Sequence, residues 1–275
     1  DLAGWRAWVD YPVDLPRGTG GVRVWLSLAK QALTGLAADV RLNDVSVRLA
    51  PELAMLTLAS LDGHLGLRLD HGFGFQARRL SLTLGDGTRV APADVDFNWQ
   101  KATDNRPAHG EASADNLDLG VVATLVDRLP LDAALREQMA AFSPRGRISG
   151  LRLSWSGEAD KPSAYAIKAR FDDLGLNARG AIPGFTGLDG RIDGHERGGV
   201  LELDTRDAHI MLPAVFAEPA LALAALEAKA DWKLVDGKVH VDLIRANFRN
   251  ADATGEASGR YQGNGAEPRS EERRV

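Results

Sequence analysis

Hydropathy with a period of two is the feature that most constrains how this chain folds. Because successive side chains of a β-strand point to opposite faces, each alternating run predicts a strand with one apolar and one polar face. Turn-forming residues lie between the runs, as at Asp62-Gly63, His71-Gly72 and Gly85-Asp86-Gly87, so the chain is predicted to form an antiparallel meander. The runs are Val22–Leu28, Leu36–Leu42, Val45–Leu49, Leu65–Leu69, Leu80–Leu84, Val95–Trp99, Leu151–Trp155, Tyr165–Phe171, Leu201–Leu203, Ile210–Leu212, Trp232–Leu234 and Val239–Leu243.

The apolar parity changes at Asn43-Asp44, between two of these runs. One extra residue swaps the faces of a strand, so this position predicts a bulge or a tight turn. A loose repeat also recurs, in which glycine or alanine stands between two apolar residues, and it favours a laterally extended sheet built of quasi-repeats. Its copies are Leu33–Leu36, Leu61–Leu65, Leu188–Ile192 and Leu226–Ala230.

Between Leu117 and Phe142 the period becomes helical. The spacing predicts a first helix with an N-cap at Asn116 and a stop at Pro130, and a second helix after an N-cap at Asp132. The chain is thus divided into a β segment 1–115, a helical hairpin insert 116–146, a second β segment 147–262 and a disordered or foreign tail 263–275. The expected apolar helix positions are Leu119, Val122, Leu125, Val126 and Leu129, then Leu135, Met139 and Phe142.

Composition excludes several classes of protein. The 275 residues carry a net charge of −5 with arginines interleaved among acids, so no nucleic-acid partner is expected. The absence of cysteine excludes disulfides, thiolate catalysis and cysteine-ligated zinc, and is compatible with an oxidising compartment. The chain has no run of about 18 apolar residues, so no membrane-spanning helix is predicted. Both ends interrupt the pattern, so we expect a piece of a longer protein.

No residue pattern predicts a catalytic or metal site. The carboxylate pairs Asp94/Asp96 and Asp172/Asp173 lie beside strands and turns, which favours solvated or turn-forming roles. Neither a nucleophile elbow nor a phosphate-binding loop occurs, so we expect no enzyme activity, no metal and no cofactor. Trp25, Trp99, Trp155 and Trp232 fit either core packing or a lipid-facing role. The histidines lack metal-ligand spacing: His64, His71, His109, His195, His209 and His240.

Several stretches resemble the YhdP family of AsmA-like envelope proteins. The resemblance rests on glycine, proline and tryptophan spacing and, with the early strands, covers nearly all of residues 1–262. The stretches are Pro183–Leu203, Leu212–Pro219 and Leu226–Trp232, with Asp127–Leu131, Leu135-Arg136 and Pro144–Gly146 in the helical region.

The resemblance implies a periplasmic protein, anchored in the inner membrane by an N-terminal helix that this chain lacks. It implies an elongated, curled β-sheet with an apolar groove that carries phospholipid towards the outer membrane, and other envelope proteins as further partners. The residues themselves leave open a structural or assembly module whose apolar face is covered. A third interpretation, an envelope hydrolase, lacks a nucleophile–base set. The expected groove positions are represented by Val40, Leu67, Leu82, Phe97, Leu153, Ile167, Leu203 and Val241.

Overall fold

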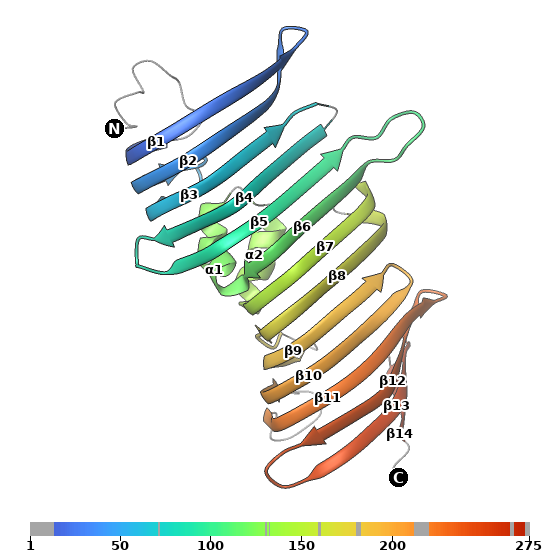
Figure 1. Ribbon diagram of the computed structural model, residues 1–275. Helices are drawn as coiled ribbons and strands as arrows, with labels where there is room; N and C mark the ends of the chain where they lie inside the picture. Colours follow the sequence, from blue (N-terminus) through green and yellow to red (C-terminus); the bar gives the residue numbers. More distant parts are fainter. Residues whose placement is uncertain are drawn as a thin grey trace. The chain divides into compact units, whose positions relative to one another are not determined.

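The computed structural model describes residues 14–70, 72–129, 131, 133–158, 161–179, 183–211, 220–264 and 267–272. They divide into two compact units, Asp1–Ala140 and Ala141–Val275. In the first unit six antiparallel strands pair in the order in which they follow along the chain (Figure 1). These strands are β1 (Asp14–Ala29), β2 (Ala32–Arg48), β3 (Leu56–Arg68), β4 (Gly72–Leu84), β5 (Arg89–Gln100) and β6 (His109–Asp118).

The second unit repeats this arrangement, with each strand paired antiparallel to the next one along the chain. The prediction of a β-dominated, mainly antiparallel fold is therefore confirmed. Its strands are β7 (Arg145–Glu158), β8 (Lys161–Leu176), β9 (Gly184–His195), β10 (Gly198–Met211), β11 (Ala220–Val235), β12 (Lys238–Arg249), β13 (Thr254–Asn264) and β14 (Glu267–Glu272).

One predicted turn lies inside a strand. Asp62-Gly63 is part of β3, and the prediction of a turn there is wrong. The strand pairing shifts between Asp62 and His64, and a Cβ on Gly63 would come 3.0 Å from the Cα of Leu80. Glycine is needed because two backbones approach closely at this irregularity, and the chain does not reverse.

The change of parity in β2 is a distortion within one strand. Asp44 has a φ of 51° while β2 continues to Arg48, and Leu42 and Val45 pack against the same apolar cluster. A similar distortion occurs in β10 at Asp207, which has a φ of 58° and lies between the buried residues Thr205 and Ala208. Such bulges keep one face of a long strand apolar although the strict alternation is interrupted.

The helical region forms two short helices, α1 (Leu119–Leu125) and α2 (Ala133–Phe142), with a 3₁₀ turn, η2 (Val126–Arg128), after α1. The N-cap of α1 is Asp118 and not Asn116, because the Asp118 Oδ1 accepts from the backbone N–H of Val121 at 3.0 Å. No residue of α2 is buried, and Leu135 is 45% exposed, so α2 does not bury the predicted apolar face. Pro130 and Asp132, the predicted stop and cap, lie outside the described residues.

The tail expected to be disordered contains a strand. Residues Glu267–Glu272 form β14, which pairs with β13 from Asn264↔Glu267 to Gly259↔Glu272. The segment has no apolar alternation, and pairing of this kind rests on backbone hydrogen bonds that complete the edge of β13.

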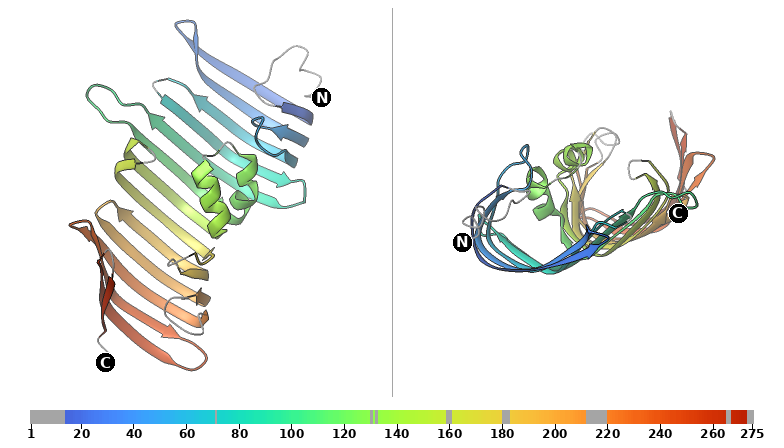
Figure 2. Two further views of the ribbon diagram at one scale, coloured as in Figure 1. Left: turned by 180° about the vertical axis from the view of Figure 1, so that it is seen from behind. Right: turned by 90° about the horizontal axis from the view of Figure 1, so that it is seen from above.

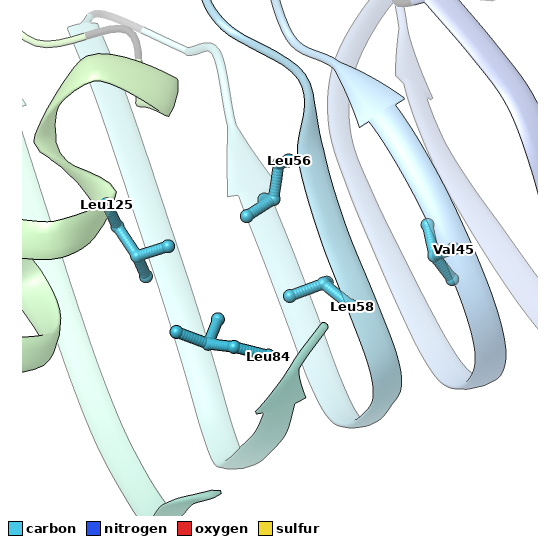
Figure 3. Packing of buried hydrophobic residues seen from close by; sticks show 5 residues of the cluster. All are labelled: Val45, Leu56, Leu58, Leu84 and Leu125. Carbon is cyan, nitrogen blue, oxygen red and sulfur yellow. The ribbon is translucent and has the colours of Figure 1, made fainter. Parts of the chain in front are cut away.

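Each unit has one closely packed apolar cluster. In the first unit Leu125 of α1 forms one cluster with the strand residues Val45, Leu56, Leu58 and Leu84 (Figure 3). In the second unit the cluster comes from the strands themselves. Its buried members are Phe171, Leu188, Ala208, Leu223 and Leu226.

Candidate functional site

The first unit has one apolar face, defined by the register of its strands. Leu36 lies opposite Leu67, Leu67 opposite Phe75, and Phe75 opposite Phe97, so these four residues form one row across β2–β5. Directly opposed residues of neighbouring strands point to the same side of a sheet, as do residues two apart on one strand. The apolar runs predicted from the sequence therefore share this face.

This apolar face has two parts. In the part that we call the covered half, α1 contributes Leu125 to the buried cluster formed by residues of β2, β3 and β4. Figure 2 shows α1 inside the curve of the strands of this unit. In the open half, at the other ends of these strands, large apolar side chains remain exposed. They include Leu26 at 61%, Leu28 at 70% and Phe73 at 41%. The open half therefore offers apolar surface to a ligand or partner, and the covered half does not.

In the second unit one row of paired residues crosses β7 to β13. Trp232 is half-buried in this row, opposite Gly199 on β10 and Val241 on β12. A Cβ on Gly194 would lie 2.7 Å from the Trp232 ring carbon Cζ2, and one on Gly199 would clash with the same carbon, so the two glycines leave room for the indole. The whole row is Leu153, Ile167, Gly194, Gly199, Trp232, Val241 and Tyr261.

This row lies in the open half of the second unit. Tyr165 and Tyr261 remain 41% and 42% exposed, and Leu234 and Val239, which oppose each other at the end of the β11–β12 hairpin, are 45% and 44% exposed. The closely packed cluster around Phe171 and Leu226 occupies the other half of the face. Both units thus combine a packed half and an open half on one apolar face.

The predicted groove residues fall into both halves. Leu82 and Leu203 pack against the buried clusters. Val40 is buried at 9% exposure between the two halves of its unit. The remaining five occupy the rows of the open halves, where they are half-buried: Leu67, Phe97, Leu153, Ile167 and Val241.

Sequence reasoning did not identify Gly194 and Gly199 as the residues that leave space for the Trp232 side chain. The signal was available, because both glycines stand at apolar-parity positions of their strands, where a side chain would otherwise be expected. The tryptophans divide between the two faces. Trp99 lies opposite Phe73 on the apolar face, whereas Trp25 lies beside His64 on the other face, with ring centroids 6.4 Å apart.

The opposite face of each unit is polar. In the first unit it carries cross-strand ion pairs between Arg41 and Asp62 at 2.8 Å and between Asp39 and His64 at 2.7 Å. Because these pairs are largely exposed, they contribute little to stability. The faces therefore differ in kind, one apolar and one charged.

The residues of the two predicted carboxylate pairs make different contacts. Asp94 Oδ1 accepts from the backbone N–H of Arg79, which has a φ of 47°, and Asp96 binds the guanidinium of Arg78, each at 2.7 Å. In the second unit the N–H of Asp173, with a φ of 51°, donates to Asp189 Oδ1 at 2.7 Å. Each unit thus uses an aspartate of the neighbouring strand to hold a left-handed residue in place.

We predict that Asp94→Ala lowers the free energy of unfolding by about 1 kcal/mol, because the N–H of Arg79 loses its acceptor. Asp94→Asn keeps an acceptor oxygen and should cost less than half as much. Denaturant unfolding measures both, with Asp104→Ala in an exposed loop as the control. Equal losses for the alanine and asparagine variants would contradict a capping role.

Among the described residues, no group of three or more His, Cys, Asp or Glu side chains is placed to hold a metal ion. The absence of a metal, a cofactor and an enzyme activity stays a prediction. No helix in the described part of the chain is long and apolar enough to span a membrane.

Comparison with known proteins gives one match. A family model described as YhdP protein matches residues 1–271. Searches of curated proteins and of solved structures found no match to this chain.

Proposed function

Since the chain belongs to the YhdP family of AsmA-like envelope proteins, we propose that its open halves bind the acyl chains of phospholipid. The full-length protein would be anchored in the inner membrane, with this segment in the periplasm, and would carry lipid towards the outer membrane. The segment acts by burial and needs no catalytic group.

The observation that carries this proposal is the concentration of exposed large apolar side chains on one face of each unit, with Trp25 on the opposite face as an exception. Leu26, Leu28 and Phe73 in the first unit, and Tyr165 and Val239 in the second, are between 41% and 70% exposed, while the opposite face carries ion pairs. Burial of an acyl chain gains about 0.8 kcal/mol per CH₂ group, so one chain of ordinary length supplies ample driving force.

The alternative is a structural or assembly module of the envelope. The covered half supports this alternative, because α1 already covers part of the apolar face there. In that case an envelope protein would cover the open halves. The two functions differ in whether lipid or protein contacts Ile167 and Leu67.

The decisive variant is Ile167→Asp, which places a charge in the open row of the second unit. We predict that crosslinking to a photoactivatable phospholipid falls at least about tenfold, because the carboxylate would have to be desolvated beneath an acyl chain. The melting temperature should change little, since water can reach the new charge when lipid is absent.

The matched control is Ala166→Asp, which adds the same charge at the next residue, on the other face. It should crosslink like the unaltered protein. Native mass spectrometry should also detect co-purified phospholipid on the unaltered chain and on the control. Unchanged crosslinking of Ile167→Asp, or its unfolding, would contradict a lipid-binding open half and favour the structural module.

A further inference from the structure

The polar face of the second unit carries a cluster of four cations on three neighbouring strands. Arg152 on β7 lies directly opposite Lys168 on β8, and Arg170 on β8 lies directly opposite Arg191 on β9. Like charges in directly opposed positions of a sheet destabilise it. Two such pairs lie side by side here, so the strand register concentrates positive charge on this part of the polar face.

The acids nearby do not neutralise this cluster. Asp193 binds Lys168 at 2.8 Å. Glu202 is shared, because it accepts from Arg191 Nε at 2.6 Å and lies 3.2 Å from Lys229 Nζ. Hydrogen bonds from Lys229 and, to a smaller extent, from Arg191 lower the pKa of Glu202. Glu202 therefore stays ionised while it binds these two side chains.

Two guanidinium groups have no partner among the described residues. Within the part of the chain that the structure describes, Arg152 and Arg170 form no ion pair and no side-chain hydrogen bond. Both line one hollow on the polar face, together with Lys168, Arg191 and Lys229. We call it the basic hollow. Its five cations face only two acids, Asp193 and Glu202.

A hollow in the first unit provides an internal comparison. It lies among Arg23, Arg41, Arg79, Asp39, Asp62 and His64, also on the polar face. There three arginines face two aspartates: Arg41 pairs with Asp62, Asp39 contacts His64, and Arg23 lies 6.0 Å from the centre of the Trp25 ring. The excess of cations over acids is larger in the basic hollow, where five cations face two acids.

We propose that the basic hollow binds a phosphate group through Arg152, Arg170 and Lys168. Guanidinium groups bind phosphate through paired N–H donors, and clustered ones suit an anion that carries more than one charge. A bound phosphate would remove the repulsion within both like-charged pairs. The site lies on the face opposite the proposed acyl-chain surface, so it does not depend on the proposed function.

The test uses inorganic pyrophosphate as the probe, in calorimetric titration at low ionic strength, because exposed charge pairs are screened by salt. The unaltered protein should bind it saturably, and the double variant Arg152→Gln/Arg170→Gln should bind at least about tenfold more weakly. The double variant Arg89→Gln/Arg206→Gln removes the same charge from two exposed positions outside the hollow and should bind within about twofold of the unaltered protein.

Thermal melting separates a binding role from a structural one. Removal of two like charges should leave the melting temperature unchanged or raise it.

A second experiment uses vesicles of phosphatidylglycerol or phosphatidylcholine. Sedimentation with phosphatidylglycerol that is lost in the Arg152/Arg170 variant assigns the phosphate to a lipid headgroup. Pyrophosphate binding without vesicle binding assigns it to a soluble phosphate compound. The proposal is overturned by absence of saturable binding, by equal weakening in both double variants, or by full competition from chloride at matched ionic strength.

Discussion

Leu58→Asp is expected to unfold the first unit, whereas Leu67→Asp, on the same face of the same strand, is expected to leave it folded. Leu58 is 4% exposed and lies opposite Val45 on one side and Leu84 on the other, in the cluster that includes Leu125 of α1 (Figure 3). An unpaired carboxylate there has no water and no partner, and the loss should be about 4 kcal/mol or more.

Leu67 lies in the open half, between Leu36 and Phe75, and is only half-buried. A carboxylate at this position keeps contact with water, so the loss should stay near about 1 kcal/mol. Thermal and urea unfolding of both variants measures the contrast, and Leu58→Ala and Leu67→Ala serve as uncharged controls. Unfolding of both charged variants would mean that the face is closed along its whole length in solution.

Gly194→Ala is expected to destabilise the second unit by about 1–3 kcal/mol, the cost of overpacking a filled site. The added methyl would lie 2.7 Å from Cζ2 and 3.1 Å from Cη2 of the Trp232 ring. The next nearest atom, the carbonyl oxygen of Gly198, is 3.7 Å away, so the indole alone opposes the substitution.

A double-mutant cycle tests this directly. In the background Trp232→Leu, Gly194→Ala should cost less than about 0.5 kcal/mol, because the ring that it meets is gone. Gly66→Ala on β3 is the matched control: its nearest neighbour is the Gln76 Cβ at 3.5 Å, an ordinary contact, and it should be neutral or slightly stabilising. An equal cost of Gly194→Ala in both backgrounds would show that Trp232 does not occupy this space.

The strands and their faces could largely be predicted from the sequence. Alternation of Leu65 and Leu67 with His64 and Arg68 places the leucines on one face and the polar residues on the other, and the register agrees. The wrong predictions concern residue types that occur in more than one structural role, such as glycine in turns and in strands. Gly63 was expected in a turn but permits close approach within β3, and Asp118 caps α1 where Asn116 was expected.

For the candidate site, the sequence predicted the apolar face of the sheet but not which residues of that face remain exposed. Alternation does not distinguish Leu82 from Ile167, because both occupy equivalent positions in alternating runs. Leu82 packs against the cluster that includes Leu125 of α1, whereas Ile167 lies in an open row. Likewise Arg170 and Arg191 are ordinary polar-face residues along their strands, and their repulsion exists only because the register opposes them.

The strands, the apolar side of each strand and the family resemblance therefore follow from local sequence alone, because alternation is a property that every strand carries with it. The folded structure is needed to tell which apolar residues are covered, which glycines make room for Trp232, and which cations share the basic hollow. These depend on contacts between strands and with α1, and local alternation does not encode such contacts because they are set by register and by bulges such as those at Asp44 and Asp207.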